Sequence, residues 1–95
     1  MSRAAPVFKA LADPHRREIL KLLRGGPRTA GEVAAALPIS KATLSHHFNL
    51  LKDADLVRCE ARGPVRLYAL NTSVVEDVTA LLLDVLGRTP ARSEP

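Results

Sequence analysis

Residues 39–57 read ISKATLSHHFNLLKDADLV, and their periodicity predicts a helix with one apolar and one polar side. At about 100° per residue, Leu44, Phe48 and Leu51 fall on one narrow stripe that faces a core. The opposite side carries small or polar side chains, namely Ala42, Ser45, His46 and Asn49. A solvated helix face usually carries Glu and Lys, whereas this one has nothing acidic before Asp53. Such a face suits the major groove of DNA.

A second, shorter helix is predicted just before this one. Thr29 and Glu32 have the spacing of a capping box, in which each side chain accepts from the other residue's backbone N–H. This box opens a helix over residues 30–37, which Pro38 ends because its ring cannot continue a helix. Ser40 is a good N-cap for the helix that follows. Two helices joined by so short a turn predict a helix-turn-helix, whose second helix enters the groove.

Two more helices are predicted nearer the N-terminus. Residues 6–12 carry Val7, Phe8 and Leu11 at helical spacing. Asp13-Pro14 then supplies an N-cap followed by a proline at the first helical position, which predicts a helix over residues 15–24. Gly25-Gly26-Pro27 ends that helix.

A β-hairpin and a last helix complete the chain. Residues 56–61 and 65–70 are rich in β-formers and flank Gly63-Pro64, which predicts a hairpin with Arg62 at its tip. Ser73 and Glu76 repeat the capping-box pattern and open a helix that ends near Leu86, before Gly87. The expected fold is therefore mainly α with a small β-hairpin, a winged helix-turn-helix with four helices, two strands and a fifth helix in chain order.

Composition fits one small DNA-binding domain. The chain has 95 residues, 46% of them hydrophobic and 25% charged, so one folded domain is expected over residues 1–87, with a disordered polar tail over 88–95. Aromatic residues make up 3%, which leaves few side chains to stack on single-stranded bases. The net charge of +4 favours phosphates as partners.

Membrane insertion, export and catalysis find no support in the sequence. No apolar run approaches the ~20 residues that span a bilayer, and no secretory signal is visible. The single cysteine, Cys59, excludes an intramolecular disulfide and fits a reducing cytosol, so a soluble cytoplasmic protein is expected. The default role of Cys59 is an inert packed thiol, and the alternative is a redox switch. No set of nucleophile, base and orienting residue can be assembled, and there is no Gly-rich phosphate loop, so neither an enzyme nor a bound cofactor is expected.

The predicted contacts with double-stranded DNA divide by chemistry. Ser45 and Asn49 are placed for base edges, Asn being suited to adenine, although either side chain also suits a phosphate. His46 is assigned to a base or phosphate, against a merely solvated histidine. The cationic and first-turn residues either hold phosphates or simply keep an exposed surface soluble. The full predicted set is Lys41, Ala42, Thr43, Ser45, His46, Asn49, Arg62 and Arg66.

Three neighbouring residues have less decided roles. His47 lies at the edge of the buried stripe, which favours a partly buried histidine bonded to backbone over a DNA contact. Arg16 and Arg17 either reach phosphate or form a salt bridge with an acidic neighbour. The acidic candidates are Asp13, Glu18 and Asp55.

The last helix predicts a homodimer. Its apolar surface is wider than the ~100° stripe needed to dock on one core, so part of it should face a partner. A two-fold dimer also places two recognition helices one turn of DNA apart, where they read a pseudo-palindrome. The expected interface residues are Val7, Leu11, Val74, Val78, Leu81, Leu82 and Val85.

Two long motifs resemble a known family. Residues 8–20, FKALADPHRREIL, followed by Leu22-Leu23, and then residues 40–57, are similar to the ArsR/SmtB family of winged helix-turn-helix bacterial transcription regulators. Residues 39–51 and 68–72 are most similar to its SdpR-like autorepressor branch. The resemblance implies a homodimer joined through the first and last helices. It also implies a recognition helix from Ser40 and an Arg62 wing along the DNA backbone or minor groove.

The sequence departs from the family at its metal sites. The family's Cys-x-Cys motif has no counterpart, because residues 29–37 contain neither Cys nor His, and its last-helix site lacks a His among residues 74–86. A new site from the remaining ligands is disfavoured because His46 and His47 are adjacent and point about 100° apart. The remaining ligands are His15, His46, His47 and Cys59. No metal is expected.

The sequence therefore predicts a homodimeric repressor that binds a pseudo-palindromic operator in double-stranded DNA, without responding to metal. Its own promoter is one candidate target. The alternative is a winged-helix module that binds only proteins, which would more often present an apolar or acidic outer face on the helix from Ser40.

Overall fold

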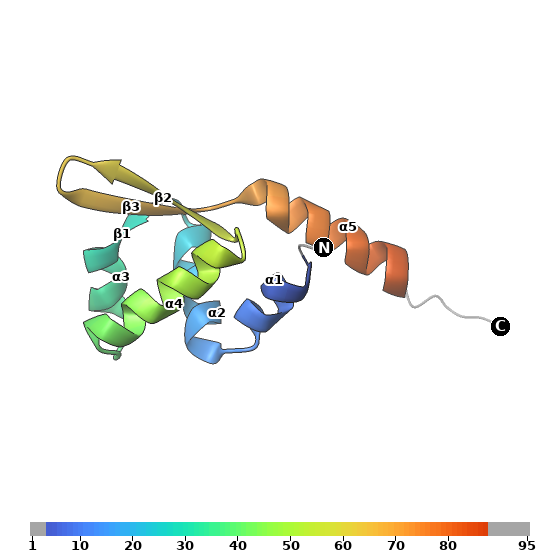
Figure 1. The fold of residues 1–95 in the computed structure, drawn as a ribbon, viewed down its shortest axis with the longest axis horizontal. Helices are drawn as coiled ribbons and strands as arrows, with labels where there is room; N and C mark the ends of the chain where they lie inside the picture. Colours follow the sequence, from blue (N-terminus) through green and yellow to red (C-terminus); the bar gives the residue numbers. More distant parts are fainter. Residues whose placement is uncertain (1–3, 88–95) are drawn as a thin grey trace.

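The computed structural model describes residues 4–87, which form five helices and three short strands (Figure 1). The elements, in chain order, are α1 (Ala4–Leu11), α2 (Pro14–Arg24), β1 (Arg28–Thr29), α3 (Ala30–Ala36), α4 (Lys41–Asp53), β2 (Val57–Arg62), β3 (Val65–Leu70) and α5 (Thr72–Leu86). The architecture is a mainly helical domain with a small antiparallel sheet, as predicted. The predicted tail over residues 88–95 lies outside the described residues.

Local capping sets the start of three helices as the sequence predicts. The Asp13 carboxylate accepts from the backbone N–H groups of His15 (2.8 Å) and Arg16 (3.2 Å), and Pro14 opens α2. The Thr29–Glu32 capping box is complete at the start of α3. These bonds satisfy N–H groups that have no partner inside a helix.

Ser40 caps α4, with its hydroxyl accepting from the Thr43 N–H at 3.1 Å. The same hydroxyl donates to the Thr43 side chain at 2.9 Å. The α4 helix ends at Asp53, and Asp55 then takes a positive φ of 59°, which turns the chain into β2. Ser40 therefore fixes the start of α4, and the change of chain direction at Asp55 follows its end.

Several predictions about the ends of elements are wrong. The helix predicted over residues 15–24 begins at Pro14, and the one predicted over residues 30–37 ends at Ala36. The Ser73–Glu76 capping box does not form, because α5 begins at Thr72 and its N-cap, Asn71, makes no side-chain cap. The Asn71 carboxamide oxygen instead accepts from Arg58 at 3.4 Å, and its backbone N–H donates to the Leu56 carbonyl. The first helix covers residues 4–11 rather than 6–12, and the first hairpin strand begins one residue later than predicted.

The sheet has the order β1-β3-β2, with both pairings antiparallel. The β2–β3 hairpin runs from the pair Val57–Leu70 to the pair Arg62–Val65 and closes through Gly63-Pro64. Gly63 has φ 61°, which a hairpin turn requires at its first position and which glycine adopts without strain. The sequence missed β1, since two residues carry no periodicity and β1 exists only through its pairing with β3.

The core holds α4 against the sheet. Leu44, Phe48 and Leu51 are buried as their periodicity predicts, together with Ile19 of α2 and Val33 of α3. The Phe48 ring stacks on the ring of Tyr68 in β3, with centroids 3.9 Å apart and planes 14° apart. This stack joins the recognition helix directly to the hairpin.

Replacing Phe48 by Ala is expected to lower the free energy of unfolding by about 3–5 kcal/mol, since the change empties a buried aromatic site. Urea unfolding followed by circular dichroism measures the loss. Val65→Ala, at an exposed hairpin position, is the control and should stay within about 0.5 kcal/mol of the unsubstituted chain. Equal losses in the two variants would show that the stack does not organise the core.

Candidate nucleic-acid interface

The outer face of α4 is open along its whole length. All six α4 residues assigned to DNA are exposed, and the three apolar residues of the opposite stripe are buried. Figure 1 shows α4 in yellow-green below the hairpin, with the hairpin tip projecting beyond α3. The exposed set is Lys41, Ala42, Thr43, Ser45, His46 and Asn49. The predicted polarity of this helix is confirmed.

An open cleft of about 770 Å³ lies between α4 and the hairpin. Ser45 and Asn49 line one wall, and Arg66 lines the other. Lys52, three residues after Asn49 and therefore on the same side of the helix, lines the α4 wall too. Lys52 was not among the predicted DNA contacts, although its spacing from Ser45 and Asn49 is the sequence signal that places it on this wall. The cleft thus combines short hydrogen-bonding groups with cations on both walls.

Near its tip, the hairpin presents Arg62 and Arg66 to solvent. Arg62 Nη2 lies 3.3 Å from Glu60 Oε1, and both side chains are exposed, so this ion pair contributes little in water and can exchange for another anion. Arg66 is exposed, and its Nη1 lies 4.0 Å from the Cys59 sulfur. Both arginines therefore lie where the sequence predicted a cationic wing.

Arg16 is a buried structural residue, which corrects both predicted roles. Only 9% of it is exposed. Its Nε donates to the Ala10 carbonyl at 2.8 Å and its Nη2 to the Lys9 carbonyl at 3.2 Å. Its Nη1 lies 3.3 Å from Nδ1 of His47. The Arg16 guanidinium therefore joins the end of α1 to the middle of α4. Arg16 is not positioned to contact a phosphate, and its hydrogen-bond partners are two carbonyls and an imidazole rather than a carboxylate.

His47 is 5% exposed, so its predicted burial is confirmed, but its partner is the Arg16 guanidinium rather than the backbone. Burial lowers the pKa of His47 because it disfavours the charged imidazolium. Among the nearby charges, Asp13 opposes this lowering and Arg16 adds to it. The imidazole is therefore held neutral at the junction of α2 and α4.

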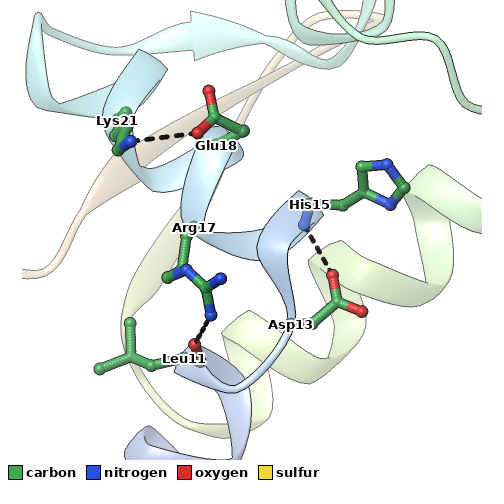
Figure 2. Close-up of polar contacts among 6 residues, drawn as sticks. All are labelled: Leu11, Asp13, His15, Arg17, Glu18 and Lys21. Atoms are coloured by element: carbon green, nitrogen blue, oxygen red, sulfur yellow. Dashed lines mark hydrogen bonds and ion pairs between the residues drawn. The ribbon is translucent and has the colours of Figure 1, made fainter.

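Arg17, the neighbour of Arg16, points to the surface. Figure 2 shows its guanidinium donating to the Leu11 carbonyl, at 2.8 Å, on the exposed side of α2. The same view shows the surface ion pair of Lys21 with Glu18, at 3.1 Å. Arg16 and Arg17 thus form a matched pair, one buried with three contacts and one exposed with a single hydrogen bond.

Arg16→Ala is expected to cost about 2–3 kcal/mol in the free energy of unfolding, because two backbone carbonyls and a buried imidazole nitrogen lose a charged donor. Arg17→Ala should cost no more than about 0.5 kcal/mol. Urea denaturation of both variants at pH 7 makes the comparison. A larger loss for Arg17→Ala would refute the anchoring role of Arg16.

The predicted dimer residues separate into two groups. Val7, Val74 and Val78 are 1%, 0% and 7% exposed and belong to the protomer's own core, which corrects their assignment to a free surface. Leu11 is partly buried beside them. Three of the predicted interface residues are exposed, namely Leu81, Leu82 and Val85. Four further large apolar residues of α1 and α5 are exposed but were not predicted for the interface: Phe8, Val75, Leu83 and Leu86.

An apolar groove of about 320 Å³ lies between α1, α2 and α5. Its walls include Leu11, Leu20, Val75 and Leu82. Figure 1 shows α5 as the outlying element, at the opposite end of the molecule from the hairpin tip. The surface over α5 is therefore apolar and well separated from the polar face of α4.

Cys59, the one cysteine of the chain, lies in β2 of the hairpin. Cys59 is half-buried opposite Tyr68, and burial, together with a bond to this thiol, raises the pKa of the Tyr68 hydroxyl. The inert role of Cys59 stays a prediction. Among the helices described in residues 4–87, none has both the length and the apolar character of a membrane span.

These features define the class: a helix-turn-helix whose second helix is open on its polar face and flanked by a cationic hairpin is a winged helix-turn-helix. A family profile described as a helix-turn-helix domain matches residues 11–60. The chain is 44% identical over 82 residues to the transcriptional repressor SdpR of Bacillus subtilis, covering 86% of this chain and 91% of that protein.

Solved structures agree with this class. The ArsR family transcriptional regulator RHA00566 superposes with a TM-score of 0.83 at 31% identity, over 88% of this chain and 92% of that one. The homodimeric winged helix-turn-helix DNA-binding domain Mb0332 of Mycobacterium bovis gives a TM-score of 0.73 at 28% identity, over 87% and 78% of the two chains. This chain belongs to the ArsR family of transcriptional regulators, and it resembles SdpR within it.

Proposed function

We propose that this protein is a sequence-specific repressor that binds double-stranded DNA as a homodimer. The observation that carries the proposal is the open polar face of α4 beside a cationic cleft and wing. Support comes from SdpR, which is named a transcriptional repressor, and from Mb0332, which is described as a homodimeric DNA-binding domain. A face without apolar or acidic patches disfavours a module that binds only proteins.

In the proposed interface, one set of residues contacts DNA phosphates and another set contacts base edges. Lys41, Thr43 and Lys52 lie at the two ends of the exposed face of α4, where cations and hydroxyls reach the DNA backbone. Ser45, His46 and Asn49 lie between them and reach base edges in the major groove. Arg62 and Arg66 extend the phosphate contacts through the wing, with Ala42 packing close to the groove floor.

The second copy is expected on α5. This helix has fifteen residues, yet only Val74 and Val78 are buried, while its other large apolar side chains are 38–75% exposed. The groove between α1, α2 and α5 offers an apolar seat for the same helix of a partner. A two-fold axis there makes the contact self-complementary and separates two α4 helices so that they read a pseudo-palindromic operator.

Repression follows from occupancy of the operator. A dimer bound over promoter DNA excludes RNA polymerase, and the resemblance to SdpR makes the protein's own promoter the first target to test. Neither metal motif described for the family occurs in residues 29–37 or 74–86, so the proposed repression does not depend on those two motifs. The protein would act in the cytoplasm, where the DNA lies.

Titration of the purified protein against its upstream promoter DNA and a scrambled duplex, at two salt concentrations, tests the proposal. Promoter DNA should bind more tightly, and both affinities should fall with salt. Arg62→Ala should weaken both complexes alike and lower the salt slope by about 1, because it removes a phosphate contact. Asn49→Ala should cost about 1–3 kcal/mol on promoter DNA and relax selection at one position per half-site.

Equal losses on the two duplexes for Asn49→Ala would remove that residue from base selection. Equal affinity of the unsubstituted chain for both duplexes would limit the protein to nonspecific binding or to distant operators. No binding to either duplex would favour the protein-interaction module.

Leu82→Glu is expected to convert the dimer to monomer, because it places two unpaired carboxylates in an apolar interface. Ala80→Glu is the control, since Ala80 is exposed on the same helix, does not line the groove and is not one of the large apolar residues of this surface. Sedimentation equilibrium reports the mass of each variant, and circular dichroism checks its fold. A Leu82→Glu protein that stays dimeric would place the interface elsewhere.

A further inference from the structure

Three metal-ligating side chains converge where the start of α2 meets the middle of α4. Asp13, His15 and His47 each offer one ligand atom, and these atoms lie within 4.8 Å of one another. The His15 and His47 ring centroids are 5.8 Å apart. Figure 2 shows the Asp13 carboxylate and the His15 ring on the same side of the chain, toward the pale green α4. We propose that these three residues bind a divalent cation of the Zn²⁺ type.

A second observation points to a ligand at the same place. His47 Nε2 is fully buried and has no hydrogen-bond partner within residues 4–87. A buried polar atom without a partner costs free energy, and native structures normally satisfy such an atom with protein, water or an ion. The unsatisfied atom belongs to the residue that joins α4 to the cluster, so a bound cation would account for it.

The donor set matches zinc chemistry. Imidazole nitrogen and carboxylate oxygen are ordinary Zn²⁺ ligands, and three protein ligands leave one tetrahedral position for water. Both cap bonds to Asp13 use Oδ1, which leaves Oδ2 for a cation without loss of the α2 cap. Binding would not unfold the helix that presents two of the ligands.

Arg16 sets a cost for metal binding. Its Nη1 donates to Nδ1 of His47, so the neutral ring carries its hydrogen on Nε2. Coordination through Nε2 requires the other tautomer, with the hydrogen on Nδ1, and Nη1 must then withdraw. The bonds from Arg16 to Ala10 and Lys9 can persist. Zn²⁺ therefore replaces one α2–α4 hydrogen bond by coordination between the same elements, with an affinity lowered by the nearby guanidinium charge.

This site differs from a site built on His15, His46, His47 and Cys59, the ligands that the sequence offered. His46 is exposed on the outer face of α4, and Cys59 lies in β2, so neither belongs to the cluster. Asp13, which the sequence assigned to a helix cap and named as a candidate ion-pair partner of Arg16 or Arg17, takes the third position. The site also differs from the family motifs at α3 and α5, which lie on other helices.

The test is titration of the metal-free full chain with Zn²⁺, followed by the thermal unfolding midpoint, and with Co²⁺, followed by visible absorption. One cation should bind per chain and raise the midpoint. His15→Ala should weaken binding about tenfold or more through loss of a ligand. Asp13→Asn should do the same while keeping the α2 cap, because Asn caps helices as well as Asp. His46→Ala, the matched control, should bind as the unsubstituted chain does.

Several outcomes would overturn the site. One is the absence of any Zn²⁺-dependent change in the unsubstituted chain at saturation. Another is a His15→Ala protein that binds Zn²⁺ as tightly as the unsubstituted chain does. Equal loss in His46→Ala, or loss in Cys59→Ser, would place the cation elsewhere. The assay contains no DNA, so its result is independent of the test of operator binding.

Discussion

The stack of Phe48 on Tyr68 is the contact on which the interface depends. It joins α4 to β3 through two rings whose centroids are 3.9 Å apart, so the position of the recognition helix is set directly against the hairpin. On the far side of α4, Arg16 and His47 join the same helix to α1 and α2. With both flanks of α4 fixed, its polar face keeps one orientation toward DNA, and binding need not order it first.

A second constraint is that α5 carries more apolar side chains than its own protomer buries. Its first two turns contribute Val74 and Val78 to the core, but the rest of the helix has more apolar surface than one protomer can cover. Such a surface is costly in water and is typical of an obligate interface. The proposed dimer and the proposed operator reading thus have a common origin, because the same two-fold axis would bury α5 and space the two α4 helices.

Much of the fold follows from local sequence signals. The Asp13, Thr29 and Ser40 caps, the Gly63-Pro64 turn and the α4 periodicity act within a few residues, and each is found where it was predicted. The exposed face of α4 follows from the same periodicity. The position of Lys52 on that face could also have been predicted from its spacing to Ser45 and Asn49. The DNA contacts themselves stay predictions, since they depend on a partner.

The sequence alone determined the helices, the hairpin and the polar face of α4, because capping, periodicity and turn chemistry are local. Tertiary structure alone decided the role of Arg16, the pairing of β1, and the burial of Val7 and Val74 within the protomer. It also brought Asp13 and His15 to His47, more than thirty residues away in the chain. These outcomes depend on which elements pack together, and no residue's neighbours in sequence carry that information.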